Sequence, residues 1–324
     1  MKKLPAVQEF IDGILKQDIA LLSRAITLVE STVAEHQQLA RQIIEGVIAH
    51  SGKSIRIGIT GVPGVGKSSF IESFGLHVVG QQHKLAVLAI DPSSQISKGS
   101  ILGDKTRMEQ LSVHPRAFIR PTPSSGSLGG VARKTQETIM LCEAAGYNYI
   151  LIETVGVGQS ETTVHQLTDF FLLLMLTGAG DELQGIKRGI MEMADALVIT
   201  KADGSNIDKA KAARAEFAMA LHLFPAAESG WVPEVKTCSS LTNEGIAEVY
   251  EMIEKYRRHS AINRYFEKKR TDQARYNLQQ LIDEQIRAKF YNTPGISEKI
   301  KSLEQLILQN KMSPYTAVEH LFVQ

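Results

Sequence analysis

Two spacings of apolar residues divide the chain into a helical beginning, an alternating middle and a helical end. Over residues 4–50, apolar side chains recur every three or four positions, which predicts amphipathic helices packed against a neighbouring layer. Ser31 and Thr32 interrupt this spacing and are candidate caps between two helices. Beyond Tyr256 the helical spacing returns and continues to the end, with breaks at Pro294 and Pro314.

In the middle of the chain, short apolar runs alternate with helical stretches. This alternation is typical of an α/β fold, in which helices cover both faces of a mainly parallel sheet. The predicted strands are 55–60, 85–90, 117–120, 149–152, 170–176, 196–200 and 235–238, and the predicted helices are 68–79, 128–145, 207–221 and 244–258. Residues 92–108 are expected to form a long polar loop, and residues 121–130 a second flexible stretch. Ligands of such sheets bind beyond the carboxyl ends of the strands.

The strongest motif lies between the first predicted strand and the helix that follows it. It reads Gly61-Val62-Pro63-Gly64-Val65-Gly66-Lys67-Ser68-Ser69, which matches the P-loop of nucleotide-binding proteins. Its glycines allow backbone N–H groups to point at phosphate oxygens, and the positive end of the next helix attracts the same charge. We expect Lys67 to reach the β and γ phosphates and the Ser68 hydroxyl to bind Mg²⁺. A chance match is disfavoured, because a strand and a helix flank the turn.

The strand at 149–152 leads to a second set of candidate phosphate-site residues. Glu153 ends this apolar run and Gly156 follows, so we expect the acid near Mg²⁺ and the glycine N–H near the γ-phosphate. Val157 stands where Ras-type GTPases carry a water-positioning Gln, which predicts slow intrinsic hydrolysis, with Gln159 as a candidate substitute. The alternative interpretation is a core strand that enters an ordinary polar turn.

Charged residues after the second predicted strand are further candidates for this site. Asp91 ends that strand, and Asp104 lies in the long polar loop. Both acids are candidates to act on Mg²⁺ or the γ-phosphate, and Lys105 and Arg107 to neutralise charge in the transition state. Each is, taken alone, also an ordinary loop charge.

Two stretches after later strands are expected to read a guanine base. Thr200-Lys201-Ala202-Asp203 approximates the NKxD motif of GTPases. Asp203 can accept hydrogen bonds from guanine N1–H and the 2-amino group, which selects GTP over ATP, and the Lys201 stem can lie along the base. Thr200 replaces the Asn that ties loops together, so we expect weaker affinity for the base with selectivity retained. Ser239-Ser240-Leu241 resembles the last base-contacting loop of GTPases, although it also reads as a small-residue strand end.

Composition restricts the expected partners and compartment. The 324 residues include 36 basic and 35 acidic side chains without an extended basic patch, which argues against nucleic acid as a partner. The longest apolar run is too short to cross a bilayer and the N-terminus lacks a signal-peptide core, so we expect no membrane association. Cys142 and Cys238 lie far apart, which indicates buried packing in a reducing, cytoplasmic setting.

Together these motifs resemble the MeaB/ArgK family of P-loop GTPases, the methylmalonyl-CoA mutase-associated GTP-binding proteins. The resemblance extends over roughly residues 10–320 and includes several words that are unusual outside the family. They are GVPGVGKS, IDPSS at 90–94, GDKTRM at 103–108, PSSGSLGG at 123–130, ETVGVGQSE at 153–161 and GAGDELQGIKRGIMEMAD at 178–195.

The resemblance implies a domain organisation and a set of site residues. It implies a helical N-terminal segment at 1–52, a GTPase domain of the SIMIBI class at 53–259 and a dimerisation arm at 260–324. The site residues that it implies are Gly61 through Ser69 for the phosphates, Asp203 and Ser239-Ser240-Leu241 for guanine, Asp91, Asp104 and Glu153 around Mg²⁺, and residues 178–187 as a further switch that faces a partner.

The resemblance also implies a biological role. Family members bind an adenosylcobalamin-dependent acyl-CoA mutase, gate the loading of its cofactor, and protect or reactivate it at the expense of GTP. Methylmalonyl-CoA mutase is therefore the expected partner, with a homodimer of the chain as the expected assembly. From the residues alone, the prediction reaches only an Mg²⁺-dependent GTPase with mobile loops.

Two functions of other classes remain open. One is a nucleotide-dependent kinase that acts on an amino-acid (lysine/arginine/ornithine) transport system, although no HRD or DFG word of the protein kinases is present. The other is a nucleotide-dependent structural dimer without useful turnover. Leu278, Leu281, Ile282 and Ile286 form an apolar stripe, which predicts either a dimerisation arm or packing onto the sheet domain.

Overall fold

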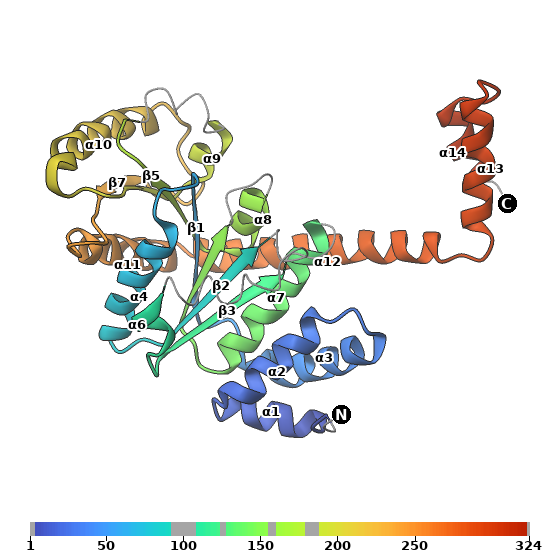
Figure 1. Cartoon of the computed structure of the whole chain (residues 1–324), viewed down its shortest axis with the longest axis horizontal. Helices are drawn as coiled ribbons and strands as arrows, with labels where there is room; N and C mark the ends of the chain where they lie inside the picture. The colour runs from blue at the N-terminus through green and yellow to red at the C-terminus, as the bar shows by residue number, and fades with distance from the viewer. Residues whose placement is uncertain (1–3, 92–107, 124–127, 155–159, 179–187, 323–324) are drawn as a thin grey trace. The chain divides into compact units, whose positions relative to one another are not determined.

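The computed structural model describes residues 4–91, 108–123, 128–154, 160–178 and 188–322, which contain a seven-stranded sheet and its flanking helices (Figure 1). The strands are β1 (Ile55–Gly61), β2 (Leu85–Asp91), β3 (Ala117–Pro123), β4 (Tyr149–Thr154), β5 (Phe170–Met175), β6 (Ala196–Ile199) and β7 (Glu234–Thr237). The helices are α1 (Val7–Leu15), α2 (Ile19–Glu30), α3 (Ala34–Val47), η1 (Ile48–His50), α4 (Lys67–Gly80), α6 (Glu109–Ser112), α7 (Leu128–Ala144), α8 (Ser160–Leu167), α9 (Arg188–Met193), η3 (Gly204–Asn206), α10 (Ile207–Leu221), α11 (Ile246–Ile262), α12 (Tyr265–Tyr291), α13 (Ile296–Leu308) and α14 (Pro314–Phe322). The predicted α/β fold is confirmed.

The strand order is β3-β2-β4-β1-β5-β6-β7, and every neighbouring pair in it is parallel. Strand β1 therefore lies inside the sheet between β4 and β5. The register pairs Ile59 with Glu153 on one side and Gly61 with Leu174 on the other. Because parallel strands end at the same edge, the residues that follow β1, β2, β4, β5, β6 and β7 meet there.

Helices cover the two faces of the sheet, so the inner strands are buried on both sides. All seven residues of β1 are buried. Ile55, Ile57 and Ile59 share a core with α4, α6 and α11, whereas alternate residues such as Ile150 and Ile152 of β4 pack towards α1–α3, α7 and α8. Figure 1 shows α1–α3 beside α7. This two-sided burial explains why the strands are continuous apolar runs rather than alternating ones.

The helical beginning contains three helices, with a break at Lys16–Asp18 that the sequence pattern did not reveal. The Asp18 carboxylate accepts hydrogen bonds from the N–H groups of Ala20 and Leu21 and so caps α2. Of the two candidate caps between helices, Ser31 is the C-cap residue of α2, and its hydroxyl accepts the Val33 N–H at 3.2 Å. Thr32 is not the N-cap residue of the next helix, because Val33 occupies that position of α3 without a side-chain cap bond.

Two further expectations need correction. Residues 121–130 are not one flexible stretch: β3 continues to Pro123 and α7 begins at Leu128, while residues 124–127 lie outside the described part of the chain. Strand β3 tolerates its two prolines because it is an edge strand, where a missing N–H costs no ladder bond. Helices α6, α8 and α9 were not predicted, since they have four, eight and six residues and too few turns for a clear period.

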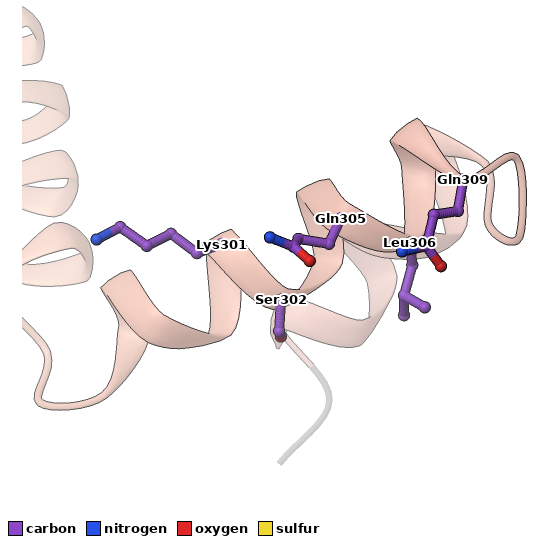
Figure 2. Close-up of a pocket in the computed structure, with 5 residues that line it drawn as sticks. All are labelled: Lys301, Ser302, Gln305, Leu306 and Gln309. Atoms are coloured by element: carbon purple, nitrogen blue, oxygen red, sulfur yellow. The ribbon is translucent and has the colours of Figure 1, made fainter.

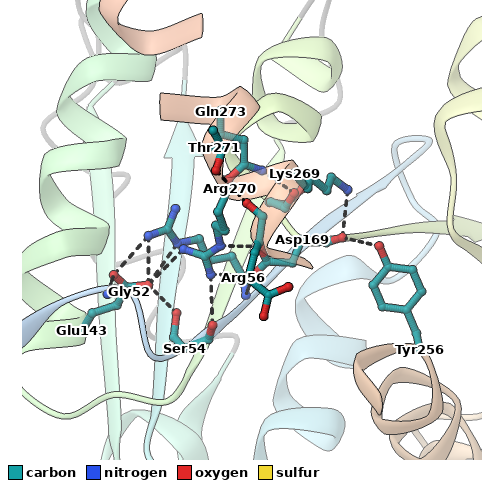
Figure 3. A network of polar contacts seen from close by, with 12 residues as sticks. Gly52, Ser54, Arg56, Glu143, Asp169, Tyr256, Lys269, Arg270, Thr271 and Gln273 are labelled. Atoms are coloured by element: carbon teal, nitrogen blue, oxygen red, sulfur yellow. Dashed lines mark hydrogen bonds and ion pairs between the residues drawn. The ribbon is translucent and has the colours of Figure 1, made fainter. Parts of the chain in front are cut away.

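A buried polar network closes the amino edge of the sheet, opposite to the strand ends named above (Figure 3). The Glu143 carboxylate of α7 accepts hydrogen bonds from Arg56 Nε at 3.0 Å and Nη2 at 3.1 Å. It also accepts the Ser54 hydroxyl and the Gly52 N–H, both at 2.6 Å. The side chains of Arg56 and Glu143 are 5% and 0% exposed, so this is a buried and multiply bonded ion pair.

Asp169, directly before β5, extends this network to α12. Its carboxylate accepts the Arg56 N–H at 2.7 Å and two N–H groups of Arg270, at 2.5 and 2.7 Å. The Asp169 carbonyl accepts the Tyr256 hydroxyl and the Lys269 ammonium, both at 2.8 Å (Figure 3). The network thus holds the first turns of α12 against the start of β1 through charge-assisted hydrogen bonds.

The chain divides into two compact units, residues 1–273 and 274–324. The helices at residues 4–50 belong to the first unit, where their apolar residues share a core with α7 and α8. The predicted domain boundaries at 52/53 and 259/260 stay predictions. No helix among the described residues is both long and apolar enough to span a membrane.

The second unit contains the end of α12 together with α13 and α14. Four of its apolar side chains on α12, at spacings of three, one and four residues, are exposed: Leu278 by 60%, Leu281 by 37%, Ile282 by 42% and Ile286 by 60%. An open hollow of about 500 Å³ lies in this unit. Figure 2 shows the residues that line it, which are Lys301, Ser302, Gln305, Leu306 and Gln309. All five lining residues lie on α13 or at its C-cap, and none is a predicted site residue, so we assign the hollow no ligand.

Candidate functional site

The glycine-rich turn joins β1 to α4 in the way that the motif predicts. Gly66 is the N-cap residue of α4 in a left-handed conformation (φ 93°), and Gly64 is also left-handed (φ 80°). Side chains with a Cβ rarely adopt these angles, so glycine is required at both positions. Lys67 and Ser68 follow in the first turn of a 14-residue helix, whose N–H groups and dipole favour an anion.

Lys67 is held inside this turn by backbone carbonyls. Its ammonium donates to the carbonyl of Gly61 at 2.7 Å and to that of Val62 at 3.4 Å. Burial lowers the pKa of Lys67 below its ordinary value, and the charges of Glu153 and Glu161 act in the opposite direction. The ammonium is therefore held by two backbone carbonyls and lies in the field of two carboxylates.

Glu153 is placed beside the phosphate turn by the register of the sheet. It is 6% exposed, lies one residue before the end of β4 and is paired with Ile59 of β1. Next to it, the Thr154 hydroxyl donates to the Thr60 hydroxyl at 2.8 Å, which joins the two strand ends. A carboxylate and the Ser68 hydroxyl are the oxygen donors that Mg²⁺ prefers, and Mg²⁺ usually takes only one or two protein ligands in addition to phosphates and water.

The segment Thr200–Asp203 is bonded directly to the phosphate turn. The Thr200 hydroxyl lies 2.7 Å from the Val65 carbonyl and 3.2 Å from that of Met175. The Lys201 ammonium donates to the Gly64 carbonyl at 2.8 Å. The Thr200 hydroxyl thus ties this segment to the phosphate turn, and the weaker base affinity expected from Thr in place of Asn stays a prediction.

The Asp203 side chain is bonded to the other predicted guanine-binding stretch, Ser239-Ser240-Leu241. Its carboxylate accepts the Ser239 hydroxyl at 2.6 Å, and the backbone N–H of Ala202 donates to the Cys238 carbonyl at 3.0 Å. The Ser239 oxygen in turn accepts the N–H groups of Leu241 and Thr242, each at 3.2 Å, which closes the turn after β7. Ser240 is bonded through its carbonyl to the Ser73 hydroxyl of α4 at 3.1 Å.

The structure thus brings together most of the predicted site residues but not all of them. Residues 61–69, Glu153, residues 200–203 and residues 239–241 lie at one edge of the sheet, on connected turns. The backbone of Asp91 ends β2 at the same edge. Asp104, Gly156, Val157, Gln159 and residues 179–187 lie outside the described residues, as do Lys105 and Arg107. Among the residues that are described, no three His, Cys, Asp or Glu side chains converge to form a metal cluster.

Two residues near this site were missed by sequence reasoning. Glu161 of α8 contributes charge at Lys67, and Asn206 of η3 donates to the Lys201 carbonyl at 2.7 Å. For Glu161 the sequence offers only a weak signal, which is its position a few residues after Gly156, the glycine predicted to lie near the γ-phosphate. Asn206 carries no sequence signal, because nothing in the motif distinguishes it from the other polar residues that follow Asp203.

The two cysteines lie in the core, as expected. Both Cys142 and Cys238 are buried and free. Burial raises the pKa of both thiols, that of Cys238 to about 12. They therefore remain protonated, and packing accounts for them.

A family model described as "Methylmalonyl Co-A mutase-associated GTPase MeaB" matches residues 22–294. The chain belongs to the MeaB family. Its relatives include "GTPase ArgK" of Escherichia coli, 40% identical over 98% of this chain and 96% of that one. Another is the mitochondrial "Methylmalonic aciduria type A homolog" of the mouse, 44% identical over 97% of this chain and 79% of the relative. The chain is accordingly a P-loop GTPase that binds guanine nucleotide.

A solved structure agrees with this family membership. The crystal structure of a protein named "LAO/AO transport system kinase" superimposes with a TM-score of 0.79, at 33% identity, over 98% of each chain. The fold shared with that protein thus extends over nearly the whole chain, including the helices that precede and follow the sheet.

Proposed function

We propose that this MeaB-family protein is an Mg²⁺-dependent GTPase that serves as a chaperone of an adenosylcobalamin-dependent acyl-CoA mutase, with methylmalonyl-CoA mutase as the first candidate. In this role GTP binding and hydrolysis gate cofactor loading and protect or reactivate the mutase. The observation that carries the nucleotide part is the direct bonding of the Thr200–Asp203 segment to the phosphate turn. The family description and the mouse relative's name support the mutase part.

Each part of the site has an assigned role in this proposal. Backbone N–H groups of residues 61–69 bind the phosphates, with Lys67 at the β and γ phosphates. Glu153 and Ser68 hold Mg²⁺ together with Asp91 and Asp104, and the bound ion neutralises charge on the phosphates. Gly156 and Gln159 act at the γ-phosphate and the attacking water. Asp203, Lys201 and residues 239–241 bind guanine.

We expect a mutase to accelerate GTP hydrolysis. The chain's own water-positioning residue is a weak substitute, so a partner that orders the site should raise kcat by about tenfold or more. The measurement is steady-state phosphate release with and without purified methylmalonyl-CoA mutase, with serum albumin at equal concentration as the control. An unchanged rate in the presence of a mutase that co-purifies with the chain would contradict the chaperone role.

Asp203→Asn is expected to change base preference from guanine to xanthine. The amide donates where the carboxylate accepts, so it loses the guanine N1–H and 2-amino groups but can donate to the 2-oxo group of XTP. GTP affinity should fall about 30-fold, as for one charge-assisted hydrogen bond. Competition binding of GDP and XDP measures the preference. Asp208→Asn, on an exposed α10 side chain (95%), is the matched control, and an unchanged preference in Asp203→Asn would mean that guanine is read elsewhere.

The second unit supports the proposal of a homodimer. Its exposed stripe of Leu278, Leu281, Ile282 and Ile286 on α12 has the spacing of one helix face and the apolar character of a buried interface. We expect a dimeric mass in light scattering for the natural chain and a monomeric mass for the double variant Leu278→Asp/Ile282→Asp. Val113→Asp, at an 81% exposed position of the first unit, should stay dimeric. A monomeric natural chain at micromolar concentration would refute the proposal.

The kinase alternative has one observation in its favour, the name "LAO/AO transport system kinase" carried by the protein whose crystal structure shares this fold. It requires transfer of the γ-phosphoryl group to a protein. Incubation with γ-labelled GTP or ATP and a periplasmic amino-acid-binding protein distinguishes the two functions, since a kinase labels that protein and a GTPase releases the label as free phosphate.

A further inference from the structure

The side chain of Asn206 connects the segment that follows β5 with the segment that follows β6. Its Nδ2 donates to the Lys201 carbonyl at 2.7 Å, and its Oδ1 accepts the Thr177 hydroxyl at 2.8 Å. Thr177 follows β5, whereas Lys201 follows β6. In addition, the Asn206 backbone N–H donates to the Asp203 carbonyl at 2.9 Å, so Asn206 closes the base-reading turn with both backbone and side chain.

The chemistry of the partners determines which way this amide points. A carbonyl oxygen can only accept, so the group facing Lys201 must be the amide nitrogen. The amide oxygen is then left for Thr177, whose hydroxyl can donate. The Lys201 carbonyl thus fixes the orientation of the amide, and the Thr177 hydroxyl adds a second hydrogen bond that anchors the Asn206 oxygen.

Lys201 needs such a grip because its backbone is left-handed, with φ of 55°. A residue with a Cβ is disfavoured in this conformation, which persists only where surrounding contacts impose it. The conformation has a consequence in this site: the Lys201 ammonium reaches the Gly64 carbonyl of the phosphate turn at 2.8 Å. Gly64 and Lys201 are therefore joined only while the turn at residues 200–206 keeps this shape.

We propose that Asn206 is a positioning residue of the nucleotide site, which holds Lys201 in its left-handed conformation and thereby keeps the base-reading turn bonded to the phosphate turn. Thr177 acts one step further away, by anchoring the Asn206 side chain through a hydrogen bond to its amide oxygen. The inference rests on the guanine site proposed above and is independent of the mutase. Asn206 itself touches no nucleotide in this scheme; it acts through Lys201.

The experiment measures GDP affinity by calorimetry for the full-length chain and a set of variants. Asn206→Ala should weaken binding about fivefold, as for one neutral hydrogen bond, and Thr177→Val about twofold. The double variant Thr177→Val/Asn206→Ala should equal Asn206→Ala, because in this proposal Thr177 acts on Lys201 through Asn206. Ser205→Ala, an exposed neighbour in the same turn, should bind as the natural chain does.

A coupling measurement separates positioning from general stabilisation. Lys201→Met should weaken GDP binding about tenfold in the natural chain but much less in the Asn206→Ala background, where Lys201 is already misplaced. Additive losses, or an Asn206→Ala affinity equal to that of Ser205→Ala, would overturn the proposal. Neither of these results would contradict the proposed guanine site, because the base preference of the Asp203→Asn variant tests that site separately.

Discussion

Replacing Lys67 with Met is expected to lower kcat/KM for GTP hydrolysis by about 10³-fold. The ammonium lies within the phosphate turn, 2.7 Å from the Gly61 carbonyl, and two carboxylates contribute charge around it. Removal of one preorganised charged donor from such a site typically costs about 10²–10³ in rate, and loss of ground-state phosphate binding adds to this. Met keeps most of the length of the side chain and so preserves the packing of the stem.

Phosphate release under steady-state conditions, with GTP varied up to millimolar concentration, measures the effect. Lys53→Met, an exposed lysine just before β1, is the matched control and should retain the natural rate. Circular dichroism shows whether each variant is folded. A Lys67→Met rate within threefold of the natural one would show that the phosphates bind elsewhere, and with it the whole assignment of the site would fail.

Glu143→Gln is expected to lower the free energy of unfolding by about 3–5 kcal/mol, the cost of removing one partner from a buried ion pair. The amide has nearly the same shape as the carboxylate, but it leaves the buried Arg56 guanidinium without a counter-charge. It also directs N–H groups at donors, since Arg56, Ser54 and the Gly52 N–H all donate to Glu143. The Arg270 guanidinium, whose Nη1 lies 3.5 Å from Glu143 Oε1, also loses the attraction of this negative charge.

Urea denaturation followed by circular dichroism gives the loss directly. Glu45→Gln, at an exposed position of α3, should change the unfolding free energy by less than about 0.5 kcal/mol. A small loss for Glu143→Gln, comparable to this control, would mean that water already reaches the amino-edge network.

The Glu143 carboxylate is also expected to make the stability of the natural chain depend on pH in the acid range. Burial by itself raises the pKa of Glu143, but the Arg56 guanidinium and its hydrogen bonds outweigh burial and hold the pKa below its ordinary value of 4.5. The contribution of Glu143 to stability is therefore fully present above about pH 4.5 and is lost as the pH falls through the lower folded-state pKa. Glu143→Gln removes this part of the acid dependence, so its stability loss should shrink at low pH.

The amino-edge network also shows where sequence reasoning stopped short. Arg56 interrupts the apolar run 55–59, and Glu143 interrupts the apolar run 139–145, so each is a lone charge in a segment predicted to be buried. A lone charge in such a run signals a buried partner of opposite sign, yet nothing local says which one. The two residues are 87 positions apart and become neighbours only when the folded chain brings the start of β1 close to the end of α7.

Prediction succeeded where the signal is local. The strands and the long helices follow from apolar spacing, and the phosphate turn follows from glycines whose left-handed angles few other residues adopt. It failed at the short helices α6, α8 and α9 and at the end of the edge strand β3, where prolines resemble a loop until the strand's place at the rim is known.

By itself, the sequence determined the α/β fold, the phosphate turn and the candidate guanine-reading acid, because periodicity, backbone freedom and side-chain chemistry are properties of adjacent residues. Only the tertiary structure decided how these parts connect. Thr200 reaches Val65 across 135 residues, Lys201 reaches Gly64 across 137, and Asn206 reaches back to Thr177 across β6. Such contacts depend on the order and register of the strands, which place the ends of β1, β5 and β6 side by side.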